Sequence, residues 1–306
     1  MLLAAQLFAG AETGYSADAA GADADSSVRA CARDWSLAAR ALPELPALRR
    51  QLSAEGYALL PPTAAGVELA AAVRRASRSP AAAAEAFELS SDGARVQGRA
   101  RHWEAALRGV PRAFEEVVAS LLASDDSGAE PLRASLVQPF LALPGAPGQS
   151  WHRDYRGAAA DWSVFLYLSD APSACATMLV PRSHGAEADF PRAPVPGAAL
   201  PQVAAAACVG AALIFTHALV HRGQAVPAAA DDGPGGGGVC RLFGYVLGGH
   251  AGGTGMPVDA FARLGYEETR VGAFEEEEEV EWPTAEEDGG GGEGEGEGDG
   301  AALSAT

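Results

Sequence analysis

The sequence predicts a mainly β domain with helical additions, whose antiparallel strands form a sandwich or a double-sheet jelly roll. Beyond residue 132 the hydrophobic pattern changes from helical to extended. Short strand-like runs, separated by Gly, Pro, Ser and Asp, occupy residues 136–143, 162–168, 177–180, 212–215 and 239–247. No helical pattern of convincing length lies between them. Strands without crossover helices favour antiparallel pairing, which predicts two facing sheets.

The region before these strands carries the helical patterns. A helix is expected over 27–40, where Ser26 or Ser27 can act as its cap, and a second short helix carries Leu48 and Leu52. That second helix should stop at Gly56, because glycine suits the left-handed C-terminal position. Residues 57–61 then predict a strand that ends at a proline.

Two further helices are expected before residue 132. An Ala-rich helix should cover 63–78, and another should begin near Pro111, a residue that suits a first helical turn. The apolar positions of the latter follow helical spacing, which indicates one face packed on a sheet: Phe114, Val117, Val118, Leu121 and Leu122.

Composition divides the chain into three regions. Residues 1–26 lack periodicity and are expected to be disordered or to form a weak targeting segment. Residues 27–270 form the predicted domain, with a helical part over 27–132, a jelly-roll core over 133–250 and a short helix near 259–264. Residues 271–306 form an acidic Gly/Glu-rich tail that should be solvated and unstructured. The glycine-rich loop 231–238 is expected to be a flexible insertion.

The net charge of −18 comes mostly from the tail. Residues 275–299 hold thirteen acids and no basic residue, so the rest of the chain has 27 acidic against 22 basic residues. No basic cluster accompanies aromatic residues, so we expect no nucleic-acid partner. The tail is most simply a solubilising appendage, and contact with a basic partner is the alternative.

The remaining composition points to a soluble, cytoplasmic protein. The four cysteines are widely spaced and form no C-x-x-C pair, which favours a reducing compartment. The first nine residues are mostly apolar but lack a basic flank, so a targeting segment has little support. No apolar run approaches the roughly 20 residues of a membrane helix, and no membrane partner is expected.

A histidine and an aspartate two residues apart follow the expected strand 136–143. On an extended segment His152 and Asp154 point to the same side, and functional sites favour such strand ends. His221, after the apolar strand 212–215, would supply a third ligand, and His217 is its competitor. We favour His221 because Arg222 and Gly223 follow it.

Two imidazoles and one carboxylate form the facial ligand set that leaves three positions open on Fe(II). The sequence therefore predicts a non-haem iron oxygenase. The remaining histidines are interpreted as hydrogen-bonded core residues: His102, His184 and His250.

Arg241 is the expected anion-binding residue. In a strand Arg241, Phe243 and Tyr245 share one face, so the guanidinium points into the barrel or lies at its rim. A buried guanidinium needs a carboxylate, and the distal carboxylate of 2-oxoglutarate fits its fork geometry. A structural Asp or Glu partner is the alternative. Arg222 is the second candidate, although as the neighbour of a metal ligand it should point away from the metal.

With these residues in place, the chain resembles the phytanoyl-CoA dioxygenase family of Fe(II)- and 2-oxoglutarate-dependent oxygenases. The resemblance covers residues 52–247, about two thirds of the chain. Its most specific pieces are Trp151-His152-Arg153-Asp154, the segment 178–185 and the run 213–215 that leads to His221-Arg222-Gly223. Within 178–185, Arg182 stands where the family usually has glycine.

The resemblance implies a double-stranded β-helix, a cupin-like jelly roll, with N-terminal helices packed on it. It implies that His152, Asp154 and His221 hold Fe(II) and that Arg241 binds 2-oxoglutarate. Tyr167 and Thr177 would line the co-substrate pocket. Dioxygen is the second co-substrate and ascorbate a further candidate cofactor.

The implied activity is hydroxylation of an unidentified small-molecule or acyl substrate, with succinate and CO₂ as co-products. Residues 161–170 and 221–226 are also similar to prolyl 4-hydroxylases, which makes protein hydroxylation an alternative. Two rival hypotheses lie outside this chemistry: a cupin-like metal protein that does not use 2-oxoglutarate, and a non-catalytic binding module.

Overall fold

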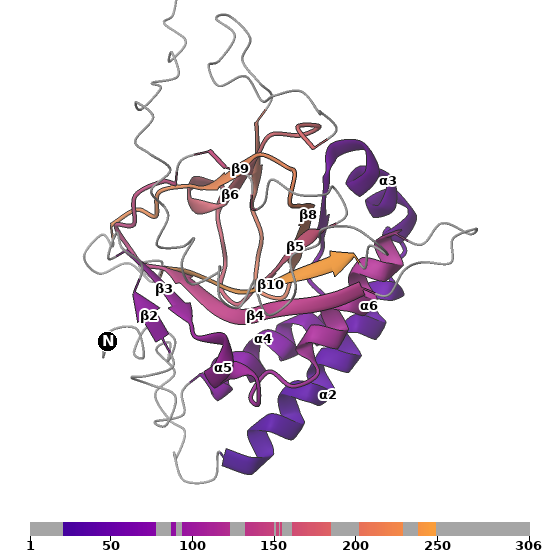
Figure 1. Cartoon of the computed structure of the whole chain (residues 1–306), viewed down its shortest axis with the longest axis vertical. Coiled ribbons are helices and arrows are strands. Elements are labelled where there is room, and N and C mark those ends of the chain that lie inside the picture. The colour runs from indigo at the N-terminus through magenta and orange to yellow at the C-terminus, as the bar shows by residue number, and fades with distance from the viewer. Residues whose placement is uncertain are drawn as a thin grey trace, which may run out of the picture.

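Three layers make up the fold of the chain. The computed structural model describes residues 21–77, 87–89, 94–122, 132–149, 151–152, 154, 161–184, 202–228 and 238–248. A small sheet faces one side of a larger sheet, and helices cover the other side of the larger sheet (Figure 1). This arrangement confirms the predicted antiparallel, mainly β architecture with helical additions.

The helices, with one short 3-10 turn, are α2 (Gly21–Arg40), α3 (Leu45–Glu55), α4 (Ala64–Ala76), α5 (Ala100–Trp103), α6 (Val110–Leu122) and η2 (Ser173–Cys175). The strands are β1 (Tyr57–Leu60), β2 (Phe87–Leu89), β3 (Arg95–Gly98), β4 (Leu132–Ala142), β5 (Trp162–Tyr167), β6 (Thr177–Leu179), β7 (Val203–Ala205), β8 (Ala212–Thr216), β9 (His221–Gly223) and β10 (Val239–Gly248).

Within the described residues the larger sheet has seven strands in the order β1-β8-β5-β10-β4-β3-β2, and the smaller has three in the order β7-β6-β9. Every ladder between these strands is antiparallel. An isolated bridge between His152 and His221 adds the segment around residue 152 to the edge of the smaller sheet. Sequence-distant segments therefore meet at this edge.

The two faces of the larger sheet follow the period of two in its strands. On β5, Val164 and Leu166 pack against the helices, whereas Phe165 and Tyr167 lie on the inner face toward the smaller sheet. All six residues of β5 are buried, so this strand is covered on both faces. The inner face is the surface on which a site can be built.

Local signals in the sequence explain the helix ends. The side chain of Thr63 accepts a hydrogen bond from the Gly66 N–H and caps α4. Gly56 ends α3 with φ of 83°, and its N–H bonds to the Leu52 carbonyl. The apolar stripe of α6 is buried as predicted, apart from Leu122, which is 37% exposed.

Several element boundaries differ from the prediction. Helix α2 begins at Gly21, inside the segment 1–26 expected to lack structure. The part 27–132 is not purely helical either, because the short strands β2 and β3 extend the larger sheet. Both are too short to show alternation in the sequence.

Strand β4 starts at Leu132, ahead of the predicted residue 136. Its pairing with β10 shifts register between Phe243 and Tyr245, opposite Leu136, which has φ of 51°. Such a bulge inserts an unpaired residue and breaks the period of two. The sequence pattern therefore identified only the part of β4 beyond the bulge.

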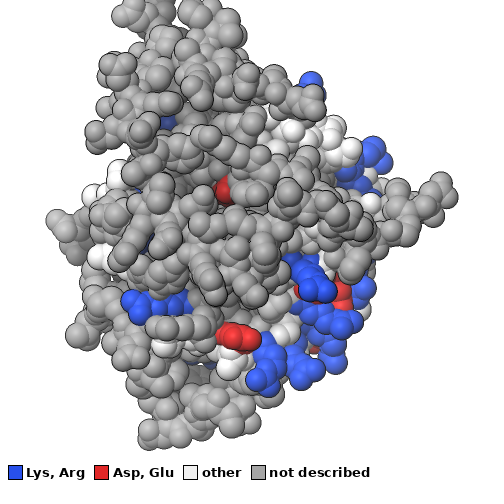
Figure 2. All heavy atoms as spheres, in the orientation of Figure 1, with Lys and Arg blue, Asp and Glu red and all other residues white. Residues whose placement is uncertain are grey.

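Arginines gather over the helical layer on the face shown in Figure 2. Acidic residues lie among them: Arg33 pairs with Asp34, and Glu116 pairs with Arg112 and, at 3.8 Å, with Arg40. These exposed pairs contribute little to stability.

Several predictions lie outside the described residues: most of segment 1–26, loop 231–237, His250, the helix near 259–264 and the acidic tail. Among the helices that the structure describes, none has the length and hydrophobicity needed to cross a bilayer.

Candidate metal centre

His152 and His221 are backbone partners at the edge of the smaller sheet. The N–H of each donates to the carbonyl of the other, and both distances are 2.9 Å. Gln149 fixes the same edge further along, since its backbone N–H donates to the Gly223 carbonyl and its side-chain oxygen accepts from the Gly223 N–H. The backbone thus brings two imidazoles to one point from segments far apart in sequence.

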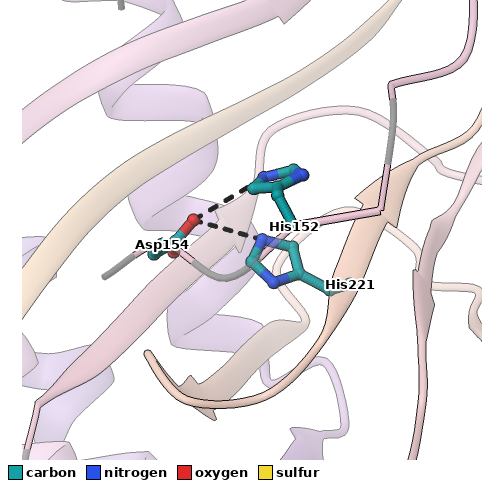
Figure 3. Close-up of side chains that lie close together, drawn as sticks. All are labelled: His152, Asp154 and His221. Carbon is teal, nitrogen blue, oxygen red and sulfur yellow. Dashed lines mark ion pairs between the residues drawn. The ribbon is translucent and has the colours of Figure 1, made fainter. Parts of the chain in front are cut away.

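Asp154 completes a cluster with these imidazoles, as Figure 3 shows. Its Oδ1 lies 3.2 Å from Nε2 of His221 and 3.8 Å from Nε2 of His152. One ligand atom from each of the three residues lies within 4.8 Å of the others. Among the described residues the structure therefore brings together the three predicted ligands and leaves His217 outside the cluster.

Hydrogen bonds behind the cluster orient two of its members. Nδ1 of His221 lies 3.0 Å from the Leu219 carbonyl, and an N–H there leaves Nε2 with a free lone pair toward Asp154. The Ser163 hydroxyl donates to Oδ2 of Asp154, which leaves Oδ1 to face the imidazoles. Ser163 lies on β5, so the larger sheet holds the carboxylate and the smaller sheet holds both histidines.

The electrostatic surroundings keep Asp154 ionised. Its side chain is only 11% exposed, and burial by itself would raise its pKa. In acid, where the imidazoles are protonated, the charge on His221 and the hydrogen bond to it, followed by the charges on His217 and His152, outweigh burial and bring the pKa of Asp154 well below the ordinary range. An ionised carboxylate with two imidazoles is the donor set of a facial Fe(II) site, so these residues fit that ion.

Arg241 lies deeper on the inner face of β10. It is 8% exposed and donates from Nη1 to Oγ1 of Thr177 at 2.8 Å. Its guanidinium carbon lies 4.5 Å from the ring centre of Phe165 and 5.0 Å from that of Phe140. No carboxylate among the described residues forms an ion pair with it.

Tyr167 and Thr177 both lie beside Arg241. Tyr167 is opposite Arg241 in the ladder between β5 and β10 and is fully buried. Burial lowers the pKa of Arg241 and raises the pKa of Tyr167. Because arginine stays protonated in proteins, burial leaves a positive charge that lacks a described counter-charge.

Arg222 and two of the remaining histidines have different surroundings. Arg222 lies over the Trp151 ring at 4.5 Å, away from the cluster as predicted for a ligand's neighbour. Nε2 of His184 lies 3.3 Å from the Ser53 carbonyl, in line with a structural role. His102 is exposed rather than buried, so its interpretation as a core residue was wrong.

Sequence reasoning missed Ser163 and Gln149. Ser163 is fully buried in strand β5, and a serine among large hydrophobic residues was the signal that could have identified it. Gln149 acts through backbone pairing, which no residue pattern indicated.

No family model and no curated protein sequence matches the chain. Solved structures do. One is the non-heme alpha ketoglutarate dependent epimerase SnoN from nogalamycin biosynthesis, with 19% identity, a TM-score of 0.52 and coverage of 67% of this chain and 83% of SnoN. The carbocyclase SnoK from the same biosynthesis matches with 17% identity, a TM-score of 0.51 and coverage of 69% and 85%.

A second SnoN structure, in complex with Fe3+, alpha ketoglutarate and nogalamycin RO, matches with 18% identity and a TM-score of 0.50 over 67% and 83% of the two chains. At these identities the likeness shows that the chain shares the fold of these proteins.

Proposed function

We propose that the chain is a non-haem Fe(II)- and 2-oxoglutarate-dependent dioxygenase with a double-stranded β-helix core. Its primary substrate would be a small molecule or acyl compound, and hydroxylation the reaction. The observation that carries this proposal is the presence of two sites between the same two sheets. A facial set of metal ligands lies there together with Arg241, a buried cation without a described counter-charge.

The metal would be held by His152, Asp154 and His221. Three protein ligands on one side leave the opposite positions free for small molecules. Ser163 and the Leu219 carbonyl fix the orientation of the carboxylate and of the His221 ring. When bound, Fe(II) and 2-oxoglutarate would activate dioxygen, the oxidant, one atom of which enters succinate and the other the primary substrate, with CO₂ released from the co-substrate.

Arg241 would bind the distal carboxylate of 2-oxoglutarate. Its planar fork can donate two parallel hydrogen bonds, and the hydrogen bond to Thr177 holds the fork in place. Phe165 and Phe140 line the guanidinium and exclude water from the ion pair, which strengthens it. Tyr167 would form the buried wall beside it.

The comparisons support this proposal at the level of the fold. SnoN and SnoK are both described as alpha ketoglutarate dependent, and one SnoN structure contains iron, alpha ketoglutarate and a small organic compound. They catalyse epimerisation and carbocycle formation, so this fold serves more than one outcome of the same co-substrate. The buried Arg241 favours 2-oxoglutarate chemistry over the cupin-like alternative, which has no need of it.

Succinate formation from 2-oxoglutarate tests the proposal without knowledge of the primary substrate. Purified protein loaded with Fe(II) should release succinate slowly in air, and His152→Ala and Asp154→Ala should abolish that release. His184→Ala, which removes a histidine outside the cluster, is the matched control and should keep it. Equal succinate release by the wild type and both ligand variants would contradict the proposal.

A further inference from the structure

His217 is a buried imidazole that the proposed function does not use. It is 0% exposed, and neither ring nitrogen has a hydrogen-bond partner among the described residues. A backbone hydrogen bond with Trp162 raises the pKa of His217, but its geometry is too poor to satisfy either ring nitrogen. Buried polar groups without partners are rare in folded proteins, because each loses its bonds to water without replacement. A missing partner is the simplest explanation.

The surroundings of His217 place it at the metal end of the inner face. Its backbone N–H donates to the Asp161 carbonyl, and its ring meets the Tyr245 ring edge-on at 4.7 Å. Tyr245 is opposite Ser163 in the ladder between β10 and β5, and Ser163 binds the metal-ligand carboxylate. His217 therefore contacts Tyr245, whose ladder partner Ser163 hydrogen-bonds to Asp154.

Arg241 and His217 lie at opposite ends of one row of side chains. Phe243 follows Arg241 on the same face of β10, and its ring lies 4.7 Å from that of Tyr245, which in turn contacts His217. The co-substrate would extend from the metal ligands toward Arg241. The other end of the row, where His217 lies, is then the end left for the primary substrate.

We propose that His217 anchors the primary substrate through a hydrogen bond to a hydroxyl or carbonyl group, and that this substrate is a neutral molecule with a ring that packs on Tyr245. The assignment rests on the proposed function and specifies its substrate class. It also explains why a polar side chain without a partner is kept inside an aromatic surface, since the substrate would supply the partner.

The chemistry of His217 selects a neutral group over an anion. Burial lowers its pKa, and the nearby carboxylates of Asp154 and Asp161 only partly oppose this effect, so the ring is neutral near pH 7. A neutral imidazole offers one donor and one acceptor, which matches a hydroxyl or a carbonyl. The aromatic rings of Tyr245 and Phe243 favour a ring as the neighbouring part of the substrate.

A stability measurement separates this role from a structural one. His217→Leu replaces the imidazole by an apolar side chain of similar size, so it removes two unpaired nitrogens from the interior. Its melting temperature should equal or exceed that of the wild type. A clear fall in the melting temperature of the apo protein would show that the imidazole holds the fold together and would overturn the assignment.

A binding measurement tests the anchor directly. The probes are p-cresol and toluene, which differ by one hydroxyl, added to Zn(II)- and 2-oxoglutarate-loaded protein and followed by ligand-observed NMR. The wild type should bind p-cresol about tenfold more tightly than toluene, as expected for one hydrogen bond to a buried group. In His217→Leu the ratio should fall to near one, and His217→Gln, which keeps a donor and an acceptor, should restore part of it.

His102→Leu, which changes an exposed histidine on α5, should behave like the wild type. Lack of a p-cresol preference in the wild type, or its persistence in His217→Leu, would overturn the assignment. Neither measurement requires dioxygen or turnover. A preference without succinate formation would therefore contradict the proposed function alone, whereas succinate formation without a preference would contradict only the assignment of His217.

Discussion

Arg241 on the larger sheet donates a hydrogen bond to Thr177 on the smaller sheet, with 2.8 Å between Nη1 and Oγ1. This bond is a direct side-chain link between the two sheets beside the candidate metal centre. Because Thr177 is 2% exposed, water does not compete for its hydroxyl. The direction of the guanidinium is therefore set before any anion arrives, which reduces the entropy lost on binding.

Arg241→Ala should weaken the binding of 2-oxoglutarate about 30-fold or more, since removal of one partner from a buried charge pair costs about 2–5 kcal/mol. Arg241→Lys keeps the charge but not the fork and should weaken binding about tenfold. Isothermal titration of the Zn(II)-loaded protein measures both. Arg222→Ala is the control, because Arg222 lies over Trp151 and should leave the dissociation constant unchanged. Equal weakening by the Arg222 and Arg241 variants would contradict the role of Arg241.

Ser163→Ala should lower metal affinity by roughly 10- to 100-fold while the fold stays intact, because the hydroxyl orients the Asp154 carboxylate. Competition with a fluorescent zinc chelator gives the dissociation constant, and circular dichroism checks the fold. Ser120→Ala, on the outer helix α6, is the matched control and should not change the affinity. Unchanged metal binding in Ser163→Ala would show that the carboxylate is held by other means.

Asp154 should make the stability of the apo protein depend on acid. Its pKa is lower in the folded chain than the ordinary value of 3.8, so the ionised form contributes stability above that value. The contribution is lost as the pH falls below about 3.8 toward the folded-state pKa. Urea unfolding between pH 6 and pH 2 should show the wild type losing more stability than Asp154→Asn. Parallel pH profiles of the two proteins would contradict the lowered pKa.

Gly56→Ala should destabilise the fold more than Gly145→Ala. Both glycines have φ slightly above 80°, where a side chain costs about 1–2 kcal/mol. A Cβ at Gly56 would clash with Nδ1 of His184 and lie 2.8 Å from Cδ1 of Leu219, whereas a Cβ at Gly145 would meet no atom within 4 Å. The difference between the two urea midpoints therefore reports the crowding of residue 56 by His184 and Leu219. Equal midpoints would show that these two side chains move aside without cost.

The features predicted best from the sequence are those in which one residue type meets one local physical requirement. Gly56 at a left-handed helix end and the apolar stripe of α6 are local features, and both were predicted. The shared face of Arg241, Phe243 and Tyr245 was also predicted, because alternate residues of any strand point to the same side.

Features that depend on tertiary contacts were not predicted. Strand β9 has three residues and exists through its pairing with β6 and His152, so its own sequence shows no alternation. Arg182 adopts φ of 68° without being glycine, and its side chain forms a bidentate pair with Glu55 on α3. The roles of Ser163 and His217 likewise depend on which strands become neighbours.

The mutual backbone bonds of His152 and His221 have a consequence for assembly of the protein. A slip of one residue between these two short segments would turn one imidazole to the opposite side. Only the correct alignment presents both nitrogens to the same ion, so metal binding would stabilise that alignment by mass action. Iron availability during synthesis would then govern how much of the chain reaches its native pairing.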